Sequence, residues 1–184
     1  MRFTDAHSSS GVCSPSRYTL LTGRYHWRSR LQSGIVSPWE RPLIAPDRLT
    51  IGGLAQQHGY HTAAIGKWHL GWDWPITPEQ KPLLVGLGGR TGRSKDPLVT
   101  VPSAAHRAAW GAIFRQPIAG GPLTRGFHHY FGTDVPNWPP YSFIRDDRTV
   151  GVPTELLAAE HMAGFQASFQ GPALPNWRFD EVLT

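Results

Sequence analysis

The chain has 184 residues, 40% hydrophobic and 17% charged, a composition typical of a folded globular protein rather than a disordered one. Lysine and arginine outnumber aspartate and glutamate, which gives a formal net charge of +5. No apolar run approaches the roughly 20 residues that a membrane-spanning helix needs, and the first residues do not resemble a signal peptide. From these residues we expect neither a membrane anchor nor an export signal in the sequence as given.

The excess of positive charge and the single cysteine limit the classes of function that the sequence allows. Four arginines cluster early in the chain, and this favours a site for anions: Arg17, Arg24, Arg28 and Arg30. We expect Arg28 and Arg30 to solvate a helix end rather than to contact a substrate. No motif of a nucleic-acid reader accompanies the charge. Cys13 has no second cysteine to pair with, so an internal disulfide is excluded.

The first predicted elements are a short strand over Met1–Asp5, a loop of small residues over 6–11 and a helix. Ser14 is the expected N-cap of this helix, with Pro15 in its first turn and Gly23 near its end. The early part of the chain thus presents its cysteine beside a helix start.

A second helix and a strand follow an extended connector over 36–48, which contains three prolines. Thr50 is the expected N-cap, and Gly59 the expected stop. The following residues are predicted to form the packing face of this helix: Ile51, Leu54, Ala55 and His58. Thr62–His69 is predicted to be a buried strand, and this order of helix, glycine and strand indicates an α/β unit.

The remainder of the chain carries weaker signals. The basic, glycine-rich stretch Gly86–Arg93 lacks the residue order of a phosphate-binding P-loop and is expected to be a mobile loop. Helices are predicted near Ala104–Phe114 and near Thr154–Ala163. There are no internal repeats, so we expect one loop-rich domain of α/β class.

The segment that follows Cys13 indicates nucleophilic chemistry on an oxyanion. A cysteine at a helix N-terminus meets free backbone N–H groups and the positive end of the helix dipole, which favour an anion or a thiolate. Arg17 lies four residues on and returns to the same helix face. Two rival chemistries fail. The tyrosine-phosphatase loop needs arginine where Thr19 stands, and a redox pair needs a second cysteine.

Lys67 and His69 form the second candidate group. Two residues apart on the expected strand, their side chains would leave the same face. Lysine supplies a compact positive charge and histidine a titratable donor near neutral pH. Either residue alone is more often a surface charge or a packed core histidine. Together with the Cys13 segment, they predict one shared site.

Both segments resemble the signature motifs of the type I sulfatases. The first motif is Cys-x-Pro-Ser-Arg followed by Thr-Gly-Arg, at 13–17 and 22–24, and the second is Gly-Lys-Trp-His-Leu-Gly at 66–71. Residues 120–144 resemble the arylsulfatase A-like branch. The resemblance implies a partial alkaline phosphatase-like fold, a mixed sheet flanked by helices. It also implies that 1–184 form a single domain truncated at both ends.

The resemblance implies a sulfuric ester hydrolase in which Cys13 is oxidised to formylglycine. The hydrated aldehyde would attack the sulfur of a sulfate ester, and the remaining hydroxyl would later expel sulfate. Arg17 would hold the formylglycine. Lys67 would neutralise the sulfate oxygens, and His69 would orient the formylglycine hydroxyl or bind the sulfate.

A calcium ion and two kinds of partner are also implied. Formylglycine at Cys13 would be one calcium ligand, while the family's other metal ligands have no counterparts in this chain, so we expect it to be weakly active or inactive alone. Expected partners are a sulfate-ester small molecule or a sulfated glycan, and the formylglycine-generating enzyme. Neither nucleic acid nor membrane is expected, and such proteins are commonly periplasmic, extracellular or lysosomal.

Two alternatives remain open. A phosphonate monoester or phosphodiester hydrolase of the same superfamily would share the formylglycine motif and the fold. A non-catalytic remnant would retain affinity for anions through Arg17, Lys67 and His69 while leaving Cys13 unmodified.

Overall fold

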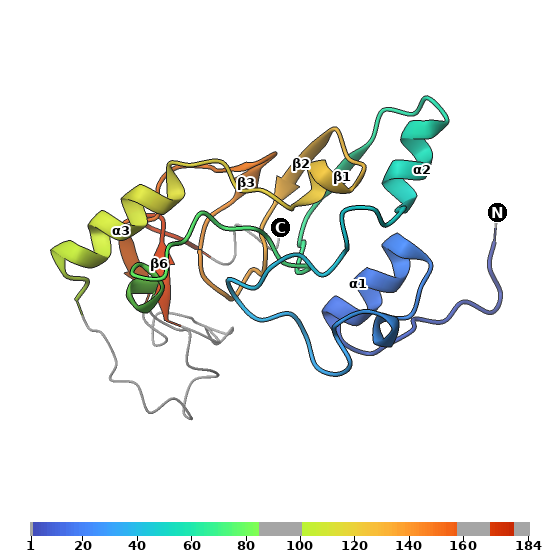
Figure 1. Cartoon of the computed structure of the whole chain (residues 1–184), viewed down its shortest axis with the longest axis horizontal. Helices are drawn as coiled ribbons and strands as arrows, with labels where there is room; N and C mark the ends of the chain where they lie inside the picture. Colours follow the sequence, from blue (N-terminus) through green and yellow to red (C-terminus); the bar gives the residue numbers. More distant parts are fainter. Residues whose placement is uncertain (1, 85–100, 158–169, 179–184) are drawn as a thin grey trace.

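The computed structural model describes residues 2–84, 101–157 and 170–178. A small mixed sheet lies between two helices at one end of the molecule and a third helix at the other (Figure 1). The helices are α1 Cys13–Thr22, α2 Ile51–Gln57 and α3 Ala104–Phe114, with short 3-10 helices η1 His26–Arg28, η2 Lys81–Leu84 and η3 Pro122–Arg125. None of the helices in these ranges is long and apolar enough to cross a bilayer.

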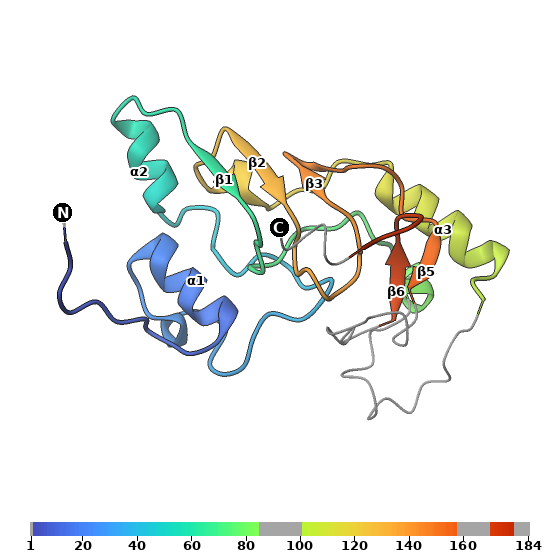
Figure 2. The same cartoon turned by 180° about the vertical axis from the view of Figure 1, so that it is seen from behind.

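The main sheet has the order β1-β2-β3-β4 and combines both strand directions. Its strands are β1 Ala63–Ile65, β2 His129–Gly132, β3 Ile144–Arg145 and β4 Arg148–Thr149. β1 runs parallel to β2, whereas the pairs β2·β3 and β3·β4 are antiparallel. A parallel pair needs a long crossover, and here the crossover carries η2, α3 and η3 (Figure 2). The expected mixed α/β architecture is confirmed.

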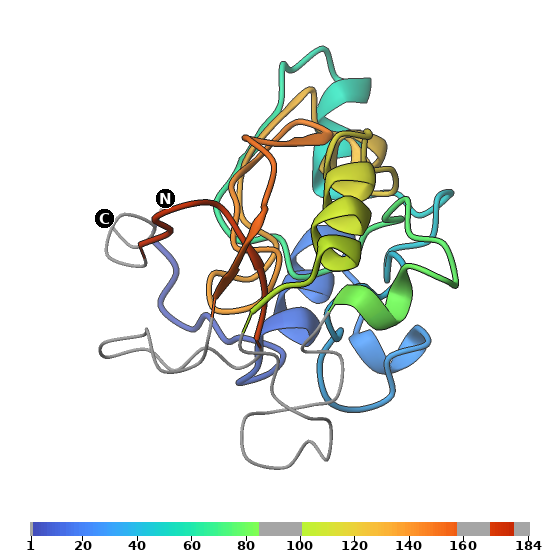
Figure 3. The ribbon, with the colours of Figure 1, turned by 90° about the vertical axis from the view of Figure 1, so that its left-hand side faces the viewer.

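A second, two-stranded sheet lies close to α3. It consists of β5 Glu155–Leu157 and β6 Gly171–Ala173, which pair antiparallel. The end of α3 joins the β3–β4 hairpin, since Thr149 Oγ1 donates to the Phe114 carbonyl at 3.0 Å. Figure 3 shows α3 running alongside the strands.

The largest hydrophobic core joins α1, the connector between α1 and α2, and the sheet. Its buried members are Tyr18, Leu31, Val36, Leu43, Ile44, Trp68, Leu70, Trp72, Ile118, Tyr130 and Ile144. The Trp72 ring lies 5.6 Å from that of Tyr130, a distance at which aromatic pairs add to the energy of burial. This core fixes the segment after β1 against both the connector and β2.

The caps of α2 and α3 confirm the helix starts predicted from sequence. Thr50 Oγ1 accepts the Gly53 N–H at 3.0 Å. Ser103 and His106 form a reciprocal capping box at α3, which spans the predicted range. Both caps satisfy N–H groups that a helix start leaves without intrahelical partners.

The predicted packing face of α2 is wrong. Ile51 is 57% exposed and Leu54 44% exposed, and His58 is also exposed. The buried residue is Gly52, where an added Cβ would lie 2.6 Å from the Gly126 carbonyl oxygen. The backbone of α2 at Gly52 packs against the backbone at Gly126. The spacing of apolar residues in the sequence cannot predict a contact of this kind.

Two of the predicted strands need correction. Residues 2–5 form no strand. The strand predicted over Thr62–His69 ends at Ile65, which is 84% exposed rather than buried. Gly66 follows with φ +100°, a conformation that turns the chain and that glycine adopts without strain.

The helix predicted over Thr154–Ala163 is wrong where it can be seen, since Glu155–Leu157 is strand β5. Residues 158–163 and the glycine-rich stretch Gly86–Arg93 lie outside the described residues. The predicted helix at Ser14 also starts earlier: Val12 is the N-cap of α1.

Candidate functional site

Cys13 is the first residue of α1, and the N-cap residue before it, Val12, makes no side-chain hydrogen bond to the first turn. No acidic residue lies in the first turn either. The predicted N-cap, Ser14, is instead buried within the helix, and its Oγ accepts the Val36 N–H at 3.1 Å. A ten-residue helix with an uncapped start presents a positive end to an anion.

Lys67 meets Cys13 directly. The Lys67 Nζ donates to the Cys13 Sγ at 3.1 Å, although 54 residues of chain separate them. The Arg17 guanidinium donates to the main-chain carbonyl of Lys67. Thus the structure brings three of the four predicted site residues together, at the start of α1 and the turn that follows β1.

The turn after β1 is held by backbone hydrogen bonds to the end of β2. Gly66 N–H donates to the Phe131 carbonyl at 2.8 Å, and Trp68 N–H to that of Thr133 at 2.9 Å. The approach is so close that a Cβ on Gly132 would lie 1.9 Å from the Gly66 carbonyl oxygen. Glycine is therefore required there, and the turn carries Lys67 at a fixed place.

His69 does not share a strand face with Lys67, as the sequence analysis expected, because β1 has already ended. It has a left-handed φ of +54° and is 2% exposed. Its Nε2 lies 2.9 Å from the Val36 carbonyl oxygen, which accepts only, so Nε2 carries the proton. No hydrogen bond joins its ring to the other three residues in the described parts of the chain, where its buried Nδ1 has no partner.

The pKa of His69 is lowered to about 3, first by burial and then by the charges of Lys67 and Arg17. The imidazole is therefore neutral near pH 7, with Nδ1 as an acceptor. It is not the titratable donor that the sequence analysis expected. A neutral Nδ1 accepts a hydrogen bond from a hydroxyl group but cannot donate one to a sulfate oxygen.

Asp134 is a buried site residue that the sequence analysis missed. Its Oδ1 accepts the His69 N–H and the Trp72 Nε1–H, both at 3.1 Å. Burial raises the pKa of this carboxyl group to about 6. Asp134 is the sole acidic residue within the aromatic-rich stretch 126–144, and a lone carboxylate in an apolar segment was the signal that could have revealed it.

The described residues do not by themselves suit the calcium ion that the resemblance implies. They contain no group of three or more His, Cys, Asp or Glu residues placed to hold a metal. The charged groups that meet around Cys13 are Lys67 and Arg17, both cations. Calcium prefers carboxylate and carbonyl oxygens, so we derive no catalytic step through a metal from this chain.

Comparison with known proteins agrees with this arrangement of motifs. The Sulfatase family model matches residues 1–132, which include all four predicted site residues. The chain belongs to the sulfatase family. Its curated relatives include arylsulfatase A of Bos taurus, 41% identical over 71 residues, and arylsulfatase G of Canis lupus familiaris, 42% identical over 80 residues. The N-acetylgalactosamine-6-O-sulfatase of Bacteroides thetaiotaomicron is 38% identical over 71 residues.

These matches cover part of each protein. The alignments span 39–42% of this sulfatase chain and 14% of each of those relatives. A structure solved in a study of the metabolism of multiple glycosaminoglycans by Bacteroides thetaiotaomicron superposes with a TM-score of 0.54 at 23% identity. That superposition covers 86% of this chain and 26% of the other, and it shows the partial sulfatase fold.

Proposed function

We propose that this chain contributes the nucleophile, at Cys13, and the neighbouring positive charges of a sulfate-ester hydrolase site. The observation that carries the proposal is the 3.1 Å contact between the Lys67 ammonium and the Cys13 Sγ at the uncapped start of α1. An ammonium group, a guanidinium group and free helix amides favour a tetrahedral oxyanion such as a sulfate ester over a neutral ligand.

Cys13 is proposed to be oxidised to formylglycine, whose hydrated aldehyde supplies the nucleophile. The side chain is partly exposed, so a modifying enzyme has access to it. Lys67 neutralises charge on the sulfate oxygens as the ester oxygen departs. Arg17 holds the Lys67 main chain and adds positive charge, and neutral His69 accepts a hydrogen bond from a hydroxyl group beside residue 13.

The substrate is proposed to be a sulfate ester, as the names of the arylsulfatase and N-acetylgalactosamine-6-O-sulfatase relatives suggest. A sulfated glycan and a small aryl sulfate share the same reacting group. We propose that residues 1–184 form a single domain, which places the sulfate group of the substrate beside Cys13. Hydrolysis by this chain alone is expected to be slow, because its described residues lack an acidic metal cluster.

The first test is the chemical state of Cys13. The chain is produced together with a formylglycine-generating enzyme, and its intact mass is compared with that of a Cys13→Ser control. Conversion of CH₂SH to CHO lowers the mass by about 18 Da. An unmodified Cys13, under conditions that convert a reference peptide, would favour the non-catalytic remnant.

The second test measures turnover of 4-nitrophenyl sulfate beside 4-nitrophenyl phosphate and a phosphonate monoester. We expect sulfate release that is slow, higher than that of Cys13→Ala and reduced at least about 100-fold by Lys67→Ala. Faster hydrolysis of either phosphorus ester would favour the alternative hydrolase class. Turnover no higher than that of Cys13→Ala would refute hydrolysis by this chain.

A further inference from the structure

A cationic pocket lies towards the end of α1 that is opposite to Cys13. It is a cavity of about 450 Å³, bounded by α1, η1, the connector and η3. Six arginines line it: Arg24, Arg28, Arg30, Arg41, Arg48 and Arg125. A single acidic residue, Asp73, also lines it. Among the described residues, the lining therefore carries a net positive charge.

Ion pairs leave most of this charge uncompensated. Arg30 pairs with Glu40 at 3.5 Å on the rim. In the described part of the chain, the other five arginines have no carboxylate within 4.0 Å. Like charges gathered in a concavity repel one another, and a bound anion would relieve that repulsion.

Arg125 makes the floor of the pocket rigid. It is 6% exposed, and its Nε donates to the Ile44 carbonyl at 3.0 Å while Nη1 donates to that of Thr124 at 2.9 Å. Burial lowers the pKa of this guanidinium group, whereas Asp73 raises it. A fixed, partly desolvated guanidinium binds an oxyanion with little loss of side-chain entropy.

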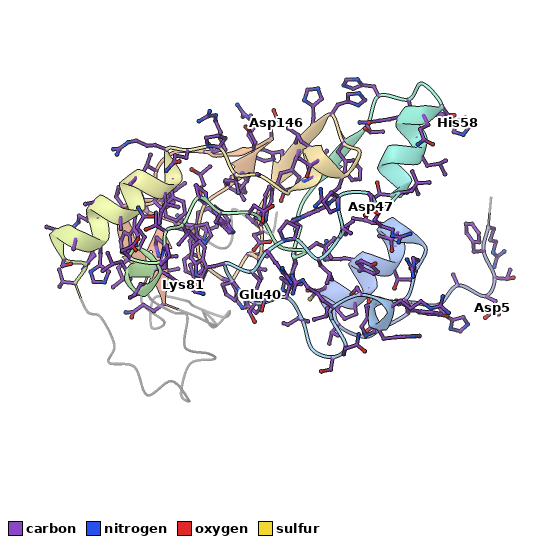
Figure 4. All side chains as sticks on the ribbon, viewed as in Figure 1. Asp5, Glu40, Asp47, His58, Lys81 and Asp146 are labelled. Atoms are coloured by element: carbon purple, nitrogen blue, oxygen red, sulfur yellow. The ribbon has the colours of Figure 1, made fainter. Side chains whose placement is uncertain are left out.

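The hollow continues beyond the pocket. A second cavity of about 640 Å³ shares Pro46, Arg48 and Arg125 with the first and reaches the N-terminus of α2. Figure 4 labels the two acidic residues of the connector, Glu40 and Asp47. Glu40 is paired with Arg30, and Asp47 lines the second cavity, not the first. Two neighbouring cavities that share lining residues suit a chain-like ligand with discrete anionic groups.

We propose that this arginine pocket binds a sulfate group of a sulfated oligosaccharide as a second, non-hydrolytic site. Guanidinium forks match the oxygens of such groups, and the exposed ring of Pro46 in the wall can pack against a sugar ring. The ten residues of α1 span about 15 Å, so one sulfated chain can reach both this pocket and Cys13. The choice of ligand rests on the proposed function.

The test is calorimetric titration of the 184-residue chain with a fully sulfated, heparin-type hexasaccharide in 150 mM salt. Arg28 and Arg41 are exposed, and their side chains make no hydrogen bond in the described structure, so Arg28→Gln/Arg41→Gln removes pocket charge without loss of core packing. Arg145→Gln/Arg148→Gln removes the same charge at exposed positions elsewhere. We expect about tenfold weaker binding for the pocket variant and less than about twofold for the control.

Titration of the chain produced without a formylglycine-generating enzyme separates this proposal from the catalytic one, since Cys13 then stays unmodified and binding is measured without turnover. The desulfated hexasaccharide should not bind. The proposal is overturned if the control variant loses as much affinity as the pocket variant. It is also overturned by equal affinity for single-stranded DNA of matched charge, or by no binding at 1 mM ligand.

Discussion

Replacing Asp134 by asparagine should change how the stability of this sulfatase depends on pH. Asparagine keeps an oxygen that accepts the His69 and Trp72 N–H groups, and it removes the ionisable carboxyl group. The pKa of Asp134 is raised from 3.8 to about 6 by burial. Between these two values the folded chain holds a proton that the unfolded chain has released, so Asp134 lowers stability as the pH rises.

The expected magnitude follows from the size of that shift. Each pKa unit corresponds to 1.36 kcal/mol, so the rise of Asp134 from 3.8 to about 6 costs the folded state about 3 kcal/mol above pH 6. His69 acts in the opposite direction. Its pKa falls from 6.5 to about 3, so its contribution to stability is present above pH 6.5 and is lost as the pH falls. In the unaltered chain, between pH 4 and 6, the loss of stability from Asp134 as the pH rises is nearly cancelled by the gain from His69.

Urea unfolding followed by tryptophan fluorescence at pH 4, 5, 6 and 7 measures this effect. The free energy of unfolding of Asp134→Asn, relative to the unaltered chain, should rise by about 2.4 kcal/mol from pH 4 to pH 7, because part of the roughly 3 kcal/mol is already present at pH 4. Asp134 is not among the causes of the His69 shift, so the His69 contribution cancels in that difference. A difference that stays constant with pH would refute the raised pKa of Asp134.

Gly121→Ala should destabilise the fold by about 1–3 kcal/mol, because its Cβ would lie 1.9 Å from the Trp72 ring. Gly11→Ala, with no atom within 4 Å of its Cβ, is the matched control in the same urea experiment. Thr50→Ala should lower the free energy of unfolding by about 1–2 kcal/mol, because Thr50 Oγ1 caps α2 and also donates to the Arg125 carbonyl at 2.6 Å. An unchanged urea midpoint would contradict that role. Calcium at 5 mM should leave the melting temperature of the chain within about 1 °C, since its described residues offer no acidic cluster, and a rise of several degrees would contradict this.

Local signals predicted the starts of α2 and α3. Thr50 and Ser103 are good N-caps, so α2 and α3 start where the sequence indicates, although the glycines in the first turn of α2 are poor helix formers. The sequence predicts the start of α1 two residues too late, because Val12 has no side chain that can cap a helix whereas serine is a preferred N-cap residue. Ser14 is used instead to hold the connector through Val36.

Long-range packing could not be predicted from one sequence. The parallel partner of β1 lies more than sixty residues further on, and nothing in Ala63–Ile65 specifies it. The position of Lys67 beside Cys13 follows from backbone bonds of the turn to β2, not from strand alternation as expected. The arginine pocket likewise joins three stretches that are far apart in the sequence, and only one of them stood out as an arginine cluster: Arg24, Arg28 and Arg30.

The Arg17 guanidinium grips the peptide oxygen of residue 67, not its side chain. Every amino acid carries this main-chain carbonyl, so replacing the Lys67 side chain leaves in place the oxygen that links the two signature motifs through Arg17. Substitution of Lys67 therefore tests the ammonium group alone. A loss of activity would be due to the missing ammonium group, because the hydrogen bond from Arg17 would still hold the backbone of residue 67 in place.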